Sequence, residues 1–461
     1  DHNNADLDDY SSLTLDRNSA TQDAQVMLFI VDQQLNIDPT DEDIVIFKVA
    51  DSGSATDSGV AWTNGTINFN WIGGTANYTA AGDGHGFGDN GKLLINMNTN
   101  GADVAVLEKD ATFDDTVTST TNGFTYLVFF EDADNAGTFS NVDDADDANL
   151  EVKSLALRGT TATFDYNDSA QSFTVANDFG TIDMDESSVG DEWNSGEALV
   201  VTLVDQDLNK NTLNDEDMTL RTHNNTIPAM IIGTPITLDS DSLIGAATLN
   251  VNSFNKIGTI ETASTVAGGA QYNVTITLPA TTVADYRTAA TAADFIFLNY
   301  NVTEVIDGTT GVLLGYNNGT ILLPSEGITA TAGLVQLDNT ITTTHVTADE
   351  SLAMLLNFTG ASDGVDAAVG ESLFVDIFTF GDKTGYDRQN NAIYRLLLEE
   401  TGDNTGVFMG DVEFIMLNQI NEDASTTYST LTTISDSIDI IVHEDLTDED
   451  SPRINYLDLG A

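Results

Sequence analysis

Oxygen-bearing side chains recur at alternate positions in the segment VDQDLNKNTLNDED, which begins at Val204. The candidate ligands in this segment are Asp205, Asp207, Asn209, Asn211, Asp215 and Glu216. Hard cations such as calcium take roughly six to eight oxygen ligands, and alternation along a loop turns such side chains to one side. The segment therefore predicts a calcium or other divalent-cation site, and the alternative is a solvated acidic turn.

The spacing of the residues limits this prediction. Glu216 is the twelfth residue counted from Asp205, which is the bidentate position of a helix–loop–helix calcium loop. The sixth residue is Lys210, where that loop requires glycine, and the flanking residues are typical of strands. The segment thus shares the ligand chemistry of such loops but not their motif.

An earlier stretch of the chain is a copy of this segment. VMLFIVDQQLNIDPTDEDIVIF, from Val26, and ALVVTLVDQDLNKNTLNDEDMTL, from Ala198, each hold an apolar run, V-D-Q-x-L-N, a polar loop and D-E-D. A spaced repeat of this kind indicates one structural unit used more than once. The candidate ligands of the first copy are Asp32, Asn36, Asp38, Asp41 and Asp43. Gln34 replaces an aspartate there, so we expect weaker cation binding.

A second internal similarity supports a modular construction. FFEDADNAGTFSNVD, from Phe129, and LLEETGDNTGVFMGDVEF, from Leu397, share an apolar end, an acidic pair, glycine and phenylalanine. Each stretch predicts a strand, an acidic turn and a return strand. The acidic clusters at residues 141–151 and 443–450 are interpreted as solvated faces.

The elements that must position these loops are predicted to be strands. Thr, Val, Ile and Phe are abundant, and short apolar runs are bounded by Asp, Asn and Gly. Runs of this kind begin at Thr125, Asp294, Ser372, Val412 and Ile438. Asp376 interrupts the run SLFVDIFTF, which predicts a strand with one wet face. The best helix candidate spans residues 282–295.

These patterns predict an all-β fold built from β-sandwich modules. For a chain of 461 residues, two to four domains are expected. The repeats place the modules at residues 1–177, 178–325 and 326–461.

The composition limits the partners of the chain. Asp and Glu number 74 against 14 Lys and Arg, so the formal net charge is -60. Such a charge repels phosphates and anionic membrane surfaces, which makes nucleic acid an unsuitable partner. Cations, including ammonium, are the natural partners, and bound ions would relieve the self-repulsion of the chain.

Signals for catalysis are poor, so the chain is predicted not to be an enzyme. It contains no Cys, and its five His residues have no zinc-site spacing. GFGDNG, from Gly86, matches a dinucleotide-binding pattern only formally and is interpreted as a turn. A secreted hydrolase that uses two carboxylates at a fixed separation remains an alternative.

Sequons for N-glycosylation occur throughout the chain and would add surface bulk where they are used. They lie at Asn64, Asn77, Asn167, Asn224, Asn273, Asn301, Asn318 and Asn357. Asn, Ser and Thr are so common in this chain that about this many sequons are expected by chance. The sequons therefore permit glycosylation but do not establish it.

Several long motifs resemble one known family. DEWNSGEALVVTLVDQDLNKNTLNDEDMTL with IGTPITL, RLLLEETGDNTGVFMGDVEFIMLNQIN and IIVHEDLTDEDSPRINYLDLGA are similar to S-layer proteins of ammonia-oxidising archaea (Thaumarchaeota). The opening LDRNSATQDAQVMLFIVDQQLNIDPTDEDIVIF is similar but has drifted. Family members are longer than this chain, so we expect a multi-domain fragment.

This resemblance implies tandem immunoglobulin-like β-sandwiches in a secreted, glycosylated lattice protein. It also implies assembly that depends on divalent cations, and a porous anionic coat in contact with ammonium. The expected function is therefore that of an extracellular structural subunit that associates with itself and has no membrane span in this segment. The alternative is a secreted adhesin or an array of carbohydrate-binding modules on the same scaffold.

Overall fold

The predicted all-β fold is confirmed by the structure. The computed structural model describes residues 10–49, 66–71, 92–96, 106–109, 126–166, 169–190, 192–223, 226–238, 243–244, 249–254, 256–260, 264–266, 273–307, 310–316, 330–337, 351–358, 364–387, 389–442 and 452–458. These residues form mostly antiparallel sheets with a few short helices. The immunoglobulin-like topology of the modules stays a prediction.

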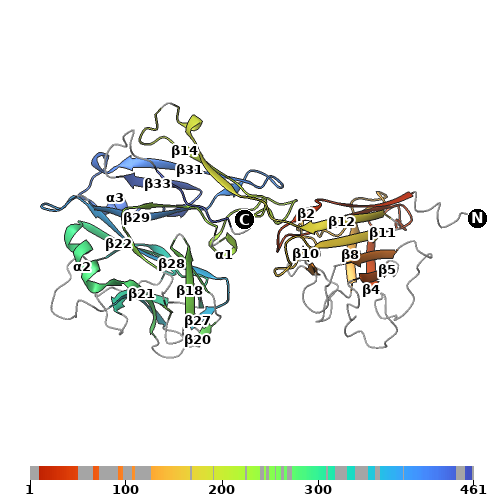
Figure 1. Cartoon of the computed structure of the whole chain (residues 1–461), viewed down its shortest axis with the longest axis horizontal. Coiled ribbons are helices and arrows are strands. Elements are labelled where there is room, and N and C mark those ends of the chain that lie inside the picture. The colour runs from red at the N-terminus through yellow and green to blue at the C-terminus, as the bar shows by residue number, and fades with distance from the viewer. Residues whose placement is uncertain are drawn as a thin grey trace, which may run out of the picture.

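The described residues make two bodies that lie end to end (Figure 1). The first, which we call the N-terminal module, ends at β12 and also contains β1 to β11. The bounds of its strands are β1 Ser11–Leu15, β2 Ser19–Ala20, β3 Leu28–Asp32, β4 Ile44–Val49, β5 Thr66–Trp71, β6 Lys92–Asn96, β7 Leu107–Lys109, β8 Tyr126–Glu131, β9 Thr138–Ser140, β10 Leu150–Val152, β11 Thr161–Tyr166 and β12 Ser169–Val175.

The main sheet of the N-terminal module curls back on itself. Its strand order is β1-β3-β9-β8-β4-β5-β6-β11-β12-β2, and β1 and β2 are consecutive in the chain. Both edges of the sheet are therefore made by one short segment. The Leu13 amide, in β1, also donates a hydrogen bond to the Ser169 hydroxyl of β12 at 3.2 Å.

Apolar side chains at alternate strand positions fill the space that this sheet encloses. Strand β11, for example, has the sequence TATFDY, and its second, fourth and sixth residues are buried. The rings of Phe47 and Phe129 meet edge to face, with centroids 5.3 Å apart. Phe47 also meets the ring of Tyr166, which lies at the end of β11. Burial of large rings of this kind is a main source of stability for a β-module.

The second body, which we call the C-terminal body, is larger. Its strands are β13 Thr181–Asp185, β14 Leu199–Val204, β15 Ala229–Ile232, β16 Ile236–Thr237, β17 Leu243–Ile244, β18 Leu249–Phe254, β19 Ile257–Ile260, β20 Ser264–Val266, β21 Asn273–Thr282, β22 Phe295–Asn301, β23 Ile306–Asp307, β24 Thr310–Tyr316, β25 Ala332–Leu337, β26 Ser351–Phe358, β27 Gly364–Ala367, β28 Ser372–Gly381, β29 Gln389–Leu396, β30 Glu399–Glu400, β31 Val407–Met416, β32 Ile434–Ser435 and β33 Ser437–Val442.

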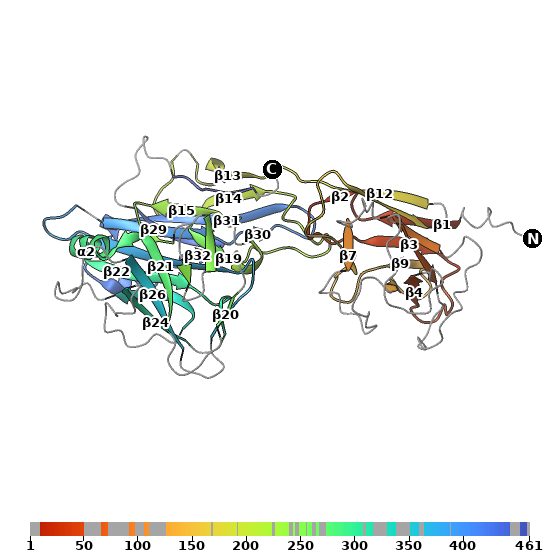
Figure 2. The same cartoon turned by 60° about the horizontal axis from the view of Figure 1, so that its bottom comes forward.

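Helical segments are few among the described residues of the C-terminal body. The α-helices are α1 Leu220–His223, α2 Val283–Ala292 and α3 Ser425–Tyr428, and the 3-10 helices are η4 Glu186–Ser188 and η5 Leu417–Gln419. Helix α2 confirms the helix predicted over residues 282–295, and it lies at the side of the body away from the N-terminal module (Figure 2). No helix in the described part of the chain is long and apolar enough to cross a membrane.

Strands far apart in the sequence build the sheets of this body. Strand β14 pairs with β31, and β31 also pairs with β30 and β33. Strands β14 and β31 lie on opposite sides of the boundary predicted between residues 325 and 326. That boundary therefore does not separate two sheets. The boundary predicted between residues 177 and 178 lies in the coil between β12 and β13.

The wet face predicted for the strand that contains Asp376 is wrong. All ten residues of β28 are buried, and Asp376 is 0% exposed. The guanidinium of Arg395, also 0% exposed, donates two hydrogen bonds to this carboxylate, at 2.6 and 3.1 Å. Thr237 and Asn299 donate to the same carboxylate. A buried charge is tolerated here because it is paired and hydrogen-bonded.

Candidate functional site at the joint of two modules

The two internal repeats of the sequence meet in space, once in each body. We call residues 32–43 loop 1 and residues 131–137 turn 1, both in the N-terminal module. Residues 205–216 are loop 2 and residues 400–406 are turn 2, both in the C-terminal body. Each loop is hydrogen-bonded to the turn of its own body, and we call the pair a loop–turn unit.

The same backbone contacts hold both loop–turn units. The Asp32 amide donates to the Gly137 carbonyl at 2.9 Å, and the Asp205 amide donates to the Gly406 carbonyl at 2.9 Å. The next residue is a glutamine in both loops, and its side-chain amide donates to a carbonyl of the turn. The distance is 2.8 Å from Gln33 to Ala136 and 2.6 Å from Gln206 to Thr405.

In each unit, a buried glutamate at the start of the turn accepts hydrogen bonds from backbone amides of the turn and of the loop. Glu131 accepts hydrogen bonds from the amides of Gly137 at 2.7 Å and Asp43 at 3.0 Å. In turn 2, Glu400 accepts from the amides of Gly406 at 2.6 Å and Glu216 at 3.1 Å. Because these two carboxylates are 4% and 5% exposed, their hydrogen bonds are worth more than the same bonds in water.

These contacts correct the alignment of the two loops. Asp43 Oδ2 accepts hydrogen bonds from the amides of residues 37 and 38, and Glu216 Oε1 accepts from the amides of residues 210 and 211. Asp43 is therefore the counterpart of Glu216, with the same offset of 173 residues that separates Asp32 from Asp205. The two D-E-D triplets, which look alike in the sequence, are one residue out of register.

A tyrosine completes each unit. The hydroxyl of Tyr166, in β11, donates to Asp32 Oδ2 at 2.7 Å. In the C-terminal body, the hydroxyl of Tyr456 donates to Asp205 Oδ2. This third repeat was not predicted, although its signal is present in the sequence as FDYND from Phe164 and INYLD from Ile454.

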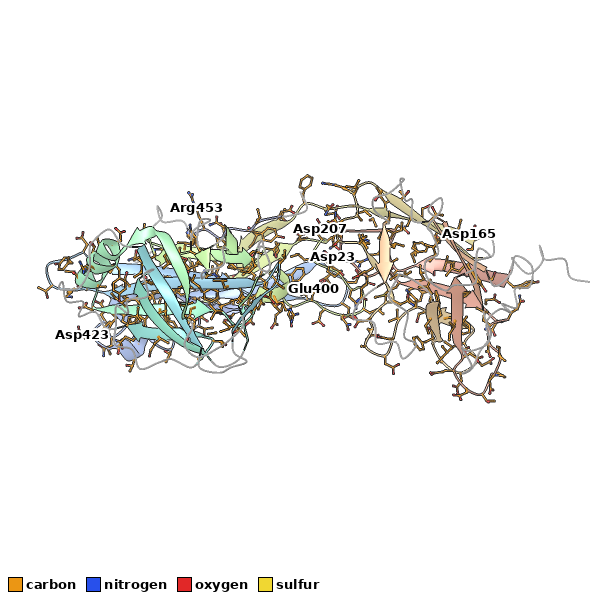
Figure 3. All side chains as sticks on the ribbon, turned by 90° about the horizontal axis from the view of Figure 1, so that it is seen from below. Asp23, Asp165, Asp207, Glu400, Asp423 and Arg453 are labelled. Atoms are coloured by element: carbon orange, nitrogen blue, oxygen red, sulfur yellow. The ribbon has the colours of Figure 1, made fainter. Side chains whose placement is uncertain are left out.

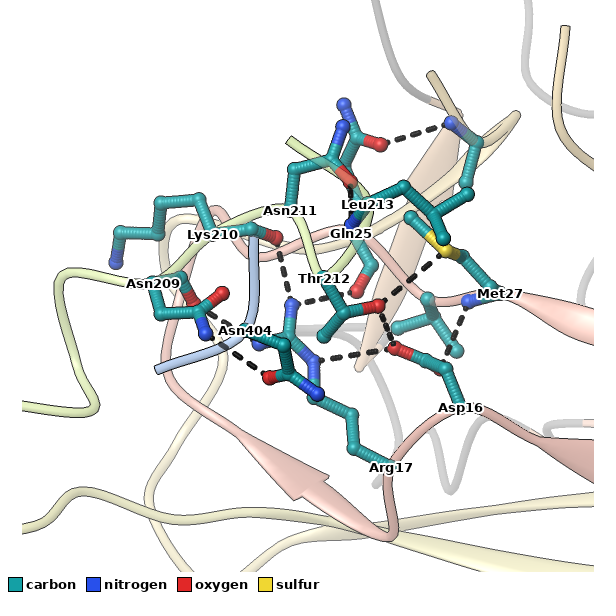
Figure 4. A network of polar contacts seen from close by, with 12 residues as sticks. Asp16, Arg17, Gln25, Met27, Asn209, Lys210, Asn211, Thr212, Leu213 and Asn404 are labelled. Carbon is teal, nitrogen blue, oxygen red and sulfur yellow. Dashed lines mark hydrogen bonds and ion pairs between the residues drawn. The ribbon is translucent and has the colours of Figure 1, made fainter. Parts of the chain in front are cut away.

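Loop 2 does more than close its own body, because it also binds the N-terminal module (Figure 4). The guanidinium of Arg17 donates to the carbonyls of Asn209 at 2.8 Å, Lys210 at 2.6 Å and Gln25 at 2.9 Å. The Gln25 amide in turn donates to the Lys210 carbonyl at 2.8 Å. We call this contact between loop 2 and the N-terminal module the joint.

Side chains of loop 2 extend the joint in several directions. Lys210 Nζ donates to the Gln22 carbonyl at 2.8 Å. Asn211 Nδ2 donates to the Asp146 carbonyl at 2.8 Å, and the Thr212 hydroxyl donates to Asp16 Oδ2 at 2.9 Å. Asn211 and Thr212 are each only 7% exposed. The joint is therefore a dense polar interface, not a flexible tether.

Asp207 joins loop 2 to residues 176–180, the coil between β12 and β13, which we call the linker. Its carboxylate accepts hydrogen bonds from Asn177 Nδ2 at 3.2 Å and from the Asp178 amide at 3.0 Å. Figure 3 shows Asp207, Asp23 and Glu400 close to the meeting point of the two bodies. The linker is thus fixed to the loop whose other residues bind the N-terminal module.

Burial determines the charge of the cationic groups in the joint. Desolvation lowers the pKa of Lys210 to about 8, against the opposing effects of Asp23 and Asp207. Desolvation also lowers the pKa of Arg17, although two nearby carboxylates favour its charged form. Arginine stays protonated at any ordinary pH, so the joint keeps at least one full positive charge.

Glu216 and Glu400 form a carboxyl pair at the base of loop 2. Burial, reinforced by Glu400, raises the pKa of Glu216 to about 8. Desolvation acts against the Glu400 carboxylate too, but hydrogen bonds from Glu216, Thr405 and Gly406 outweigh it and lower its pKa. Because the pKa of Glu216 is raised and that of Glu400 is lowered, the proton of the pair resides on Glu216.

The oxygens predicted as cation ligands in loop 2 are mostly committed to protein donors. Asp205 accepts from Tyr456 and from the Asp207 amide, and Asn211 Oδ1 accepts from the Leu213 amide. No group of three His, Asp or Glu side chains converges as a metal site requires among the described residues. Arg17 binds backbone carbonyls of loop 2, and Lys210 binds the Gln22 carbonyl, so neither donates a hydrogen bond to these side-chain oxygens. Calcium binding stays a prediction.

Loop 1 uses its predicted ligands in a similar way, but without a cationic side chain. Asp32 accepts from Tyr166 and the Gln34 amide, and Asp38 accepts from Thr40. Asn36 Oδ1, like Asn209 Oδ1, is buried without a hydrogen-bond partner. Asp41 and Asp215, the remaining predicted ligands, are exposed.

Most predicted glycosylation sites are outside the described residues. These are Asn64, Asn77, Asn167, Asn224 and Asn318. Asn301 lies at the end of β22, half-buried, and accepts a hydrogen bond from the Thr303 amide. Asn273 and Asn357 are directly opposite each other in the pairing of β21 with β26. Residues 86–91 and 443–450 also lie outside the described part of the chain.

Comparison with known proteins does not identify a family. No family model matches the chain, and no curated protein matches it either. A crystal structure of a mutant of Salmonella alpha-2-macroglobulin aligns with 84% of this chain and 27% of that chain, at 9% sequence identity and a TM-score of 0.08. The chain thus spans about a quarter of that protein's length, and a likeness at this score carries no argument.

Proposed function

We propose that this chain is a structural subunit of an extracellular coat, an S-layer, in which copies associate into a porous and strongly anionic sheet. The observation that carries the proposal is the joint. Two β-bodies are fixed to each other by directed hydrogen bonds around Arg17, and a lattice needs subunits of fixed shape. The resemblance of the long sequence motifs supports the same conclusion independently.

The net charge gives the coat its second property. With 14 basic residues against 74 acidic ones, and with Arg17 and Lys210 engaged in the joint, the surface carries very little positive charge. Many carboxylates around a narrow pore overlap their potentials and raise the local concentration of cations, including ammonium. Screening confines this enrichment to pores and crevices, since the Debye length is about 8 Å at physiological salt.

Divalent cations have a natural role in such an assembly. Copies with a net charge of -60 repel each other, so bound calcium or other divalent ions would reduce the cost of bringing them together. This role needs only exposed carboxylates, such as those of Asp41 and Asp215. It does not require a closed ligand cage in loop 2.

Electron microscopy of the purified protein, with calcium and with chelator, tests the proposal. We expect ordered sheets with calcium and dispersed particles with chelator at the same ionic strength. Dispersed particles under every condition, including high salt and high protein concentration, would contradict the proposal. Specific capture of a glycan by dispersed particles would favour the adhesin alternative.

A further inference from the structure

Loop 1 is a free copy of a surface that loop 2 uses for binding. Loop 2 positions Asn209, Asn211 and Thr212 are 1%, 7% and 7% exposed; the joint covers Asn211 and Thr212, while the Asn209 side chain donates to Asn404 of turn 2. Their counterparts at the offset of 173 residues are Asn36, Asp38 and Pro39, of which Asp38 and Pro39 are exposed. The same loop geometry is thus covered by a neighbouring body in one case and open in the other.

The open copy is more apolar than the covered one. Ile37 occupies the position of Lys210 and is 57% exposed. Ile44, directly after the loop, is 48% exposed and occupies the position of Asp217. Lys210 belongs to the joint, whereas Asp217 is exposed, so Ile37 is the one of the two that replaces a polar side chain at a docking position.

An exposed aromatic residue accompanies both copies. Ser12 pairs with Val31 as Thr181 pairs with Val204, so Tyr10 and Phe179 occupy the same position, two residues earlier. Both side chains are 76% exposed. We call the surface formed by Tyr10, Ile37, Asp38 and Ile44 the head face of the N-terminal module.

The partner of the head face can be identified from what loop 2 binds. Loop 2 binds the end of the N-terminal module, where Asp16 to Gln25 connect β1 to the strand β3. In the C-terminal body, residues 185–198 run from the last residue of β13 to the residue before the corresponding strand β14. This connection, which we call the tail face, is mostly exposed among the described residues.

The tail face, like the head face, has lost a cationic side chain and gained an apolar one relative to its counterpart, residues 16–25. Glu186 replaces Arg17 in the alignment of β1 with β13, so the cation that binds loop 2 is missing. Trp193 is added, half-buried, with its ring 4.7 Å from that of Phe414 and its Nε1 donating to the Glu197 carbonyl. The tail face thus has a carboxylate where the joint has a guanidinium, and it adds an indole elsewhere in the connection, which suits the aliphatic Ile37 of the head face.

We propose that the head face of one copy binds the tail face of a second copy, in a head-to-tail contact that repeats the geometry of the joint. This contact rests on the proposed function and names the surfaces that would serve it. A heterologous contact of this kind does not close on itself unless the rotation permits a ring, so it generates rows of copies.

Charge sets the conditions for this contact. The head face carries Asp38 and Asp41, and the tail face carries Asp185, Glu186 and Glu197. Like charges oppose the contact, while burial of Ile37, Ile44 and Trp193 favours it. Association should therefore strengthen when salt or calcium screens the carboxylates, which is the reverse of what an interface held by ion pairs shows.

Sedimentation velocity of the whole chain at low salt, at high salt and with calcium tests the proposal. We compare the wild type with the double variant Ile37→Asp, Ile44→Asp. As a matched control we use Leu155→Asp, Leu157→Asp, which alters two side chains that are 69% and 67% exposed outside both faces. If the double variant melts at a lower temperature than the wild type, the single variant Ile37→Ser replaces it in the comparison.

We expect larger species of the wild type and of the control as salt or calcium increases, and monomers of the Ile37 variants throughout. Adding the double variant to the wild type should shorten the rows, since it keeps an intact tail face. If the Ile37 variants associate as the wild type does, the head face is wrong while the proposed coat function stands. If the wild type stays monomeric under all conditions, both fail.

Discussion

Arg17 Nη2 donates a hydrogen bond to the Lys210 carbonyl at 2.6 Å, across 193 residues of sequence. The same guanidinium also binds the carbonyls of Asn209 and Gln25. One side chain of the N-terminal module therefore holds loop 2 through its backbone. This arrangement uses one of the 14 basic residues of a very acidic chain to fix the relative position of two bodies.

Removal of this side chain should loosen the joint without unfolding either body. Arg17→Ala leaves three carbonyls without a charged donor, and hydrogen bonds to charged groups are worth about 1.5–3 kcal/mol each. We expect amide hydrogen exchange of residues 209–214 to accelerate at least tenfold. Arg158→Ala, which removes one bond to the Asn177 carbonyl at 3.1 Å, is the control and should leave exchange in loop 2 unchanged.

Two groups at the joint give stability a minimum near pH 8. The pKa of Glu216 is raised from 4.5 to about 8. The contribution of this group to the free energy of unfolding is therefore complete below pH 4.5 and is lost as the pH rises to 8. The pKa of Lys210 is lowered from 10.5 to about 8, so its contribution is complete above 10.5 and is lost as the pH falls to 8. Denaturation midpoints measured from pH 5 to pH 10 should show this minimum.

Variants separate the two limbs of this pH profile. Glu216→Gln should flatten the acidic limb and raise the midpoint at pH 7, because a neutral amide replaces a carboxyl that must otherwise hold a proton. Lys210→Met should flatten the alkaline limb only. A Glu216→Gln profile identical to that of the wild type would show that this carboxyl does not stay protonated in the folded protein.

A side chain at the turn glycines should destabilise both loop–turn units. Gly137 and Gly406 have φ of +62° and +57°, and a Cβ at either would lie 2.0 or 2.2 Å from the amide nitrogen of the loop glutamine. Gly137→Ala should therefore displace the Gln33 side chain from the Ala136 carbonyl and cost that hydrogen bond in addition to the roughly 1–2 kcal/mol of a left-handed conformation. Gly159→Ala is the matched control, since Gly159 has a φ of +80° and open space around it. Equal losses in thermal stability would rule out the steric contact.

The buried pair of Asp376 and Arg395 should behave as a coupled unit. Arg395→Met leaves the carboxylate with only Thr237 and Asn299, and breaking a buried pair on one side costs about 3–5 kcal/mol. The double variant Asp376→Leu, Arg395→Met should cost less than Arg395→Met alone. A double-mutant cycle from urea denaturation measures the coupling, and additive losses would contradict it.

Calcium should raise the melting temperature through exposed carboxylates, compared with chelator at constant ionic strength. Asp205→Ala with Asp207→Ala removes hydrogen bonds from Tyr456 and Asn177, so it should lower the melting temperature even in chelator. Asp32→Ala tests loop 1 in the same way. If calcium stabilises the wild type but not the double variant, loop 2 binds the ion after all. A melting temperature that does not respond to calcium in any variant would remove calcium from the account.

Much of the fold was predictable because it depends on local patterns. Short β-branched runs predicted the strands, and the moderate periodicity of residues 282–295 predicted helix α2. The repeats also predicted that one unit is used twice. They could not predict that loop 1, from Asp32, is hydrogen-bonded to turn 1, from Glu131, because contacts between distant segments leave no periodic signal.

The role of loop 2 was hidden for a related reason. Alternating side-chain oxygens predict a cation site, but Arg17 binds the backbone carbonyls of the loop, which leave no signal in the sequence, and it is 188 residues from Asp205. Asp376 shows the same limit, since a lone carboxylate in an apolar run indicates a wet face unless its partner is known. The one-residue shift between the D-E-D triplets also needed the hydrogen bonds of Asp43 and Glu216 to be seen.

The distance between the two bodies, measured with and without metal ions, tests the central claim that protein groups hold the joint. The chain has no Cys, so Ser172→Cys and Asp183→Cys introduce unique positions for spin labels. We predict a narrow distance distribution that is the same with calcium and with chelator and that broadens when Arg17→Ala is added. A distribution that is narrow only with calcium, and indifferent to Arg17→Ala, would contradict this account.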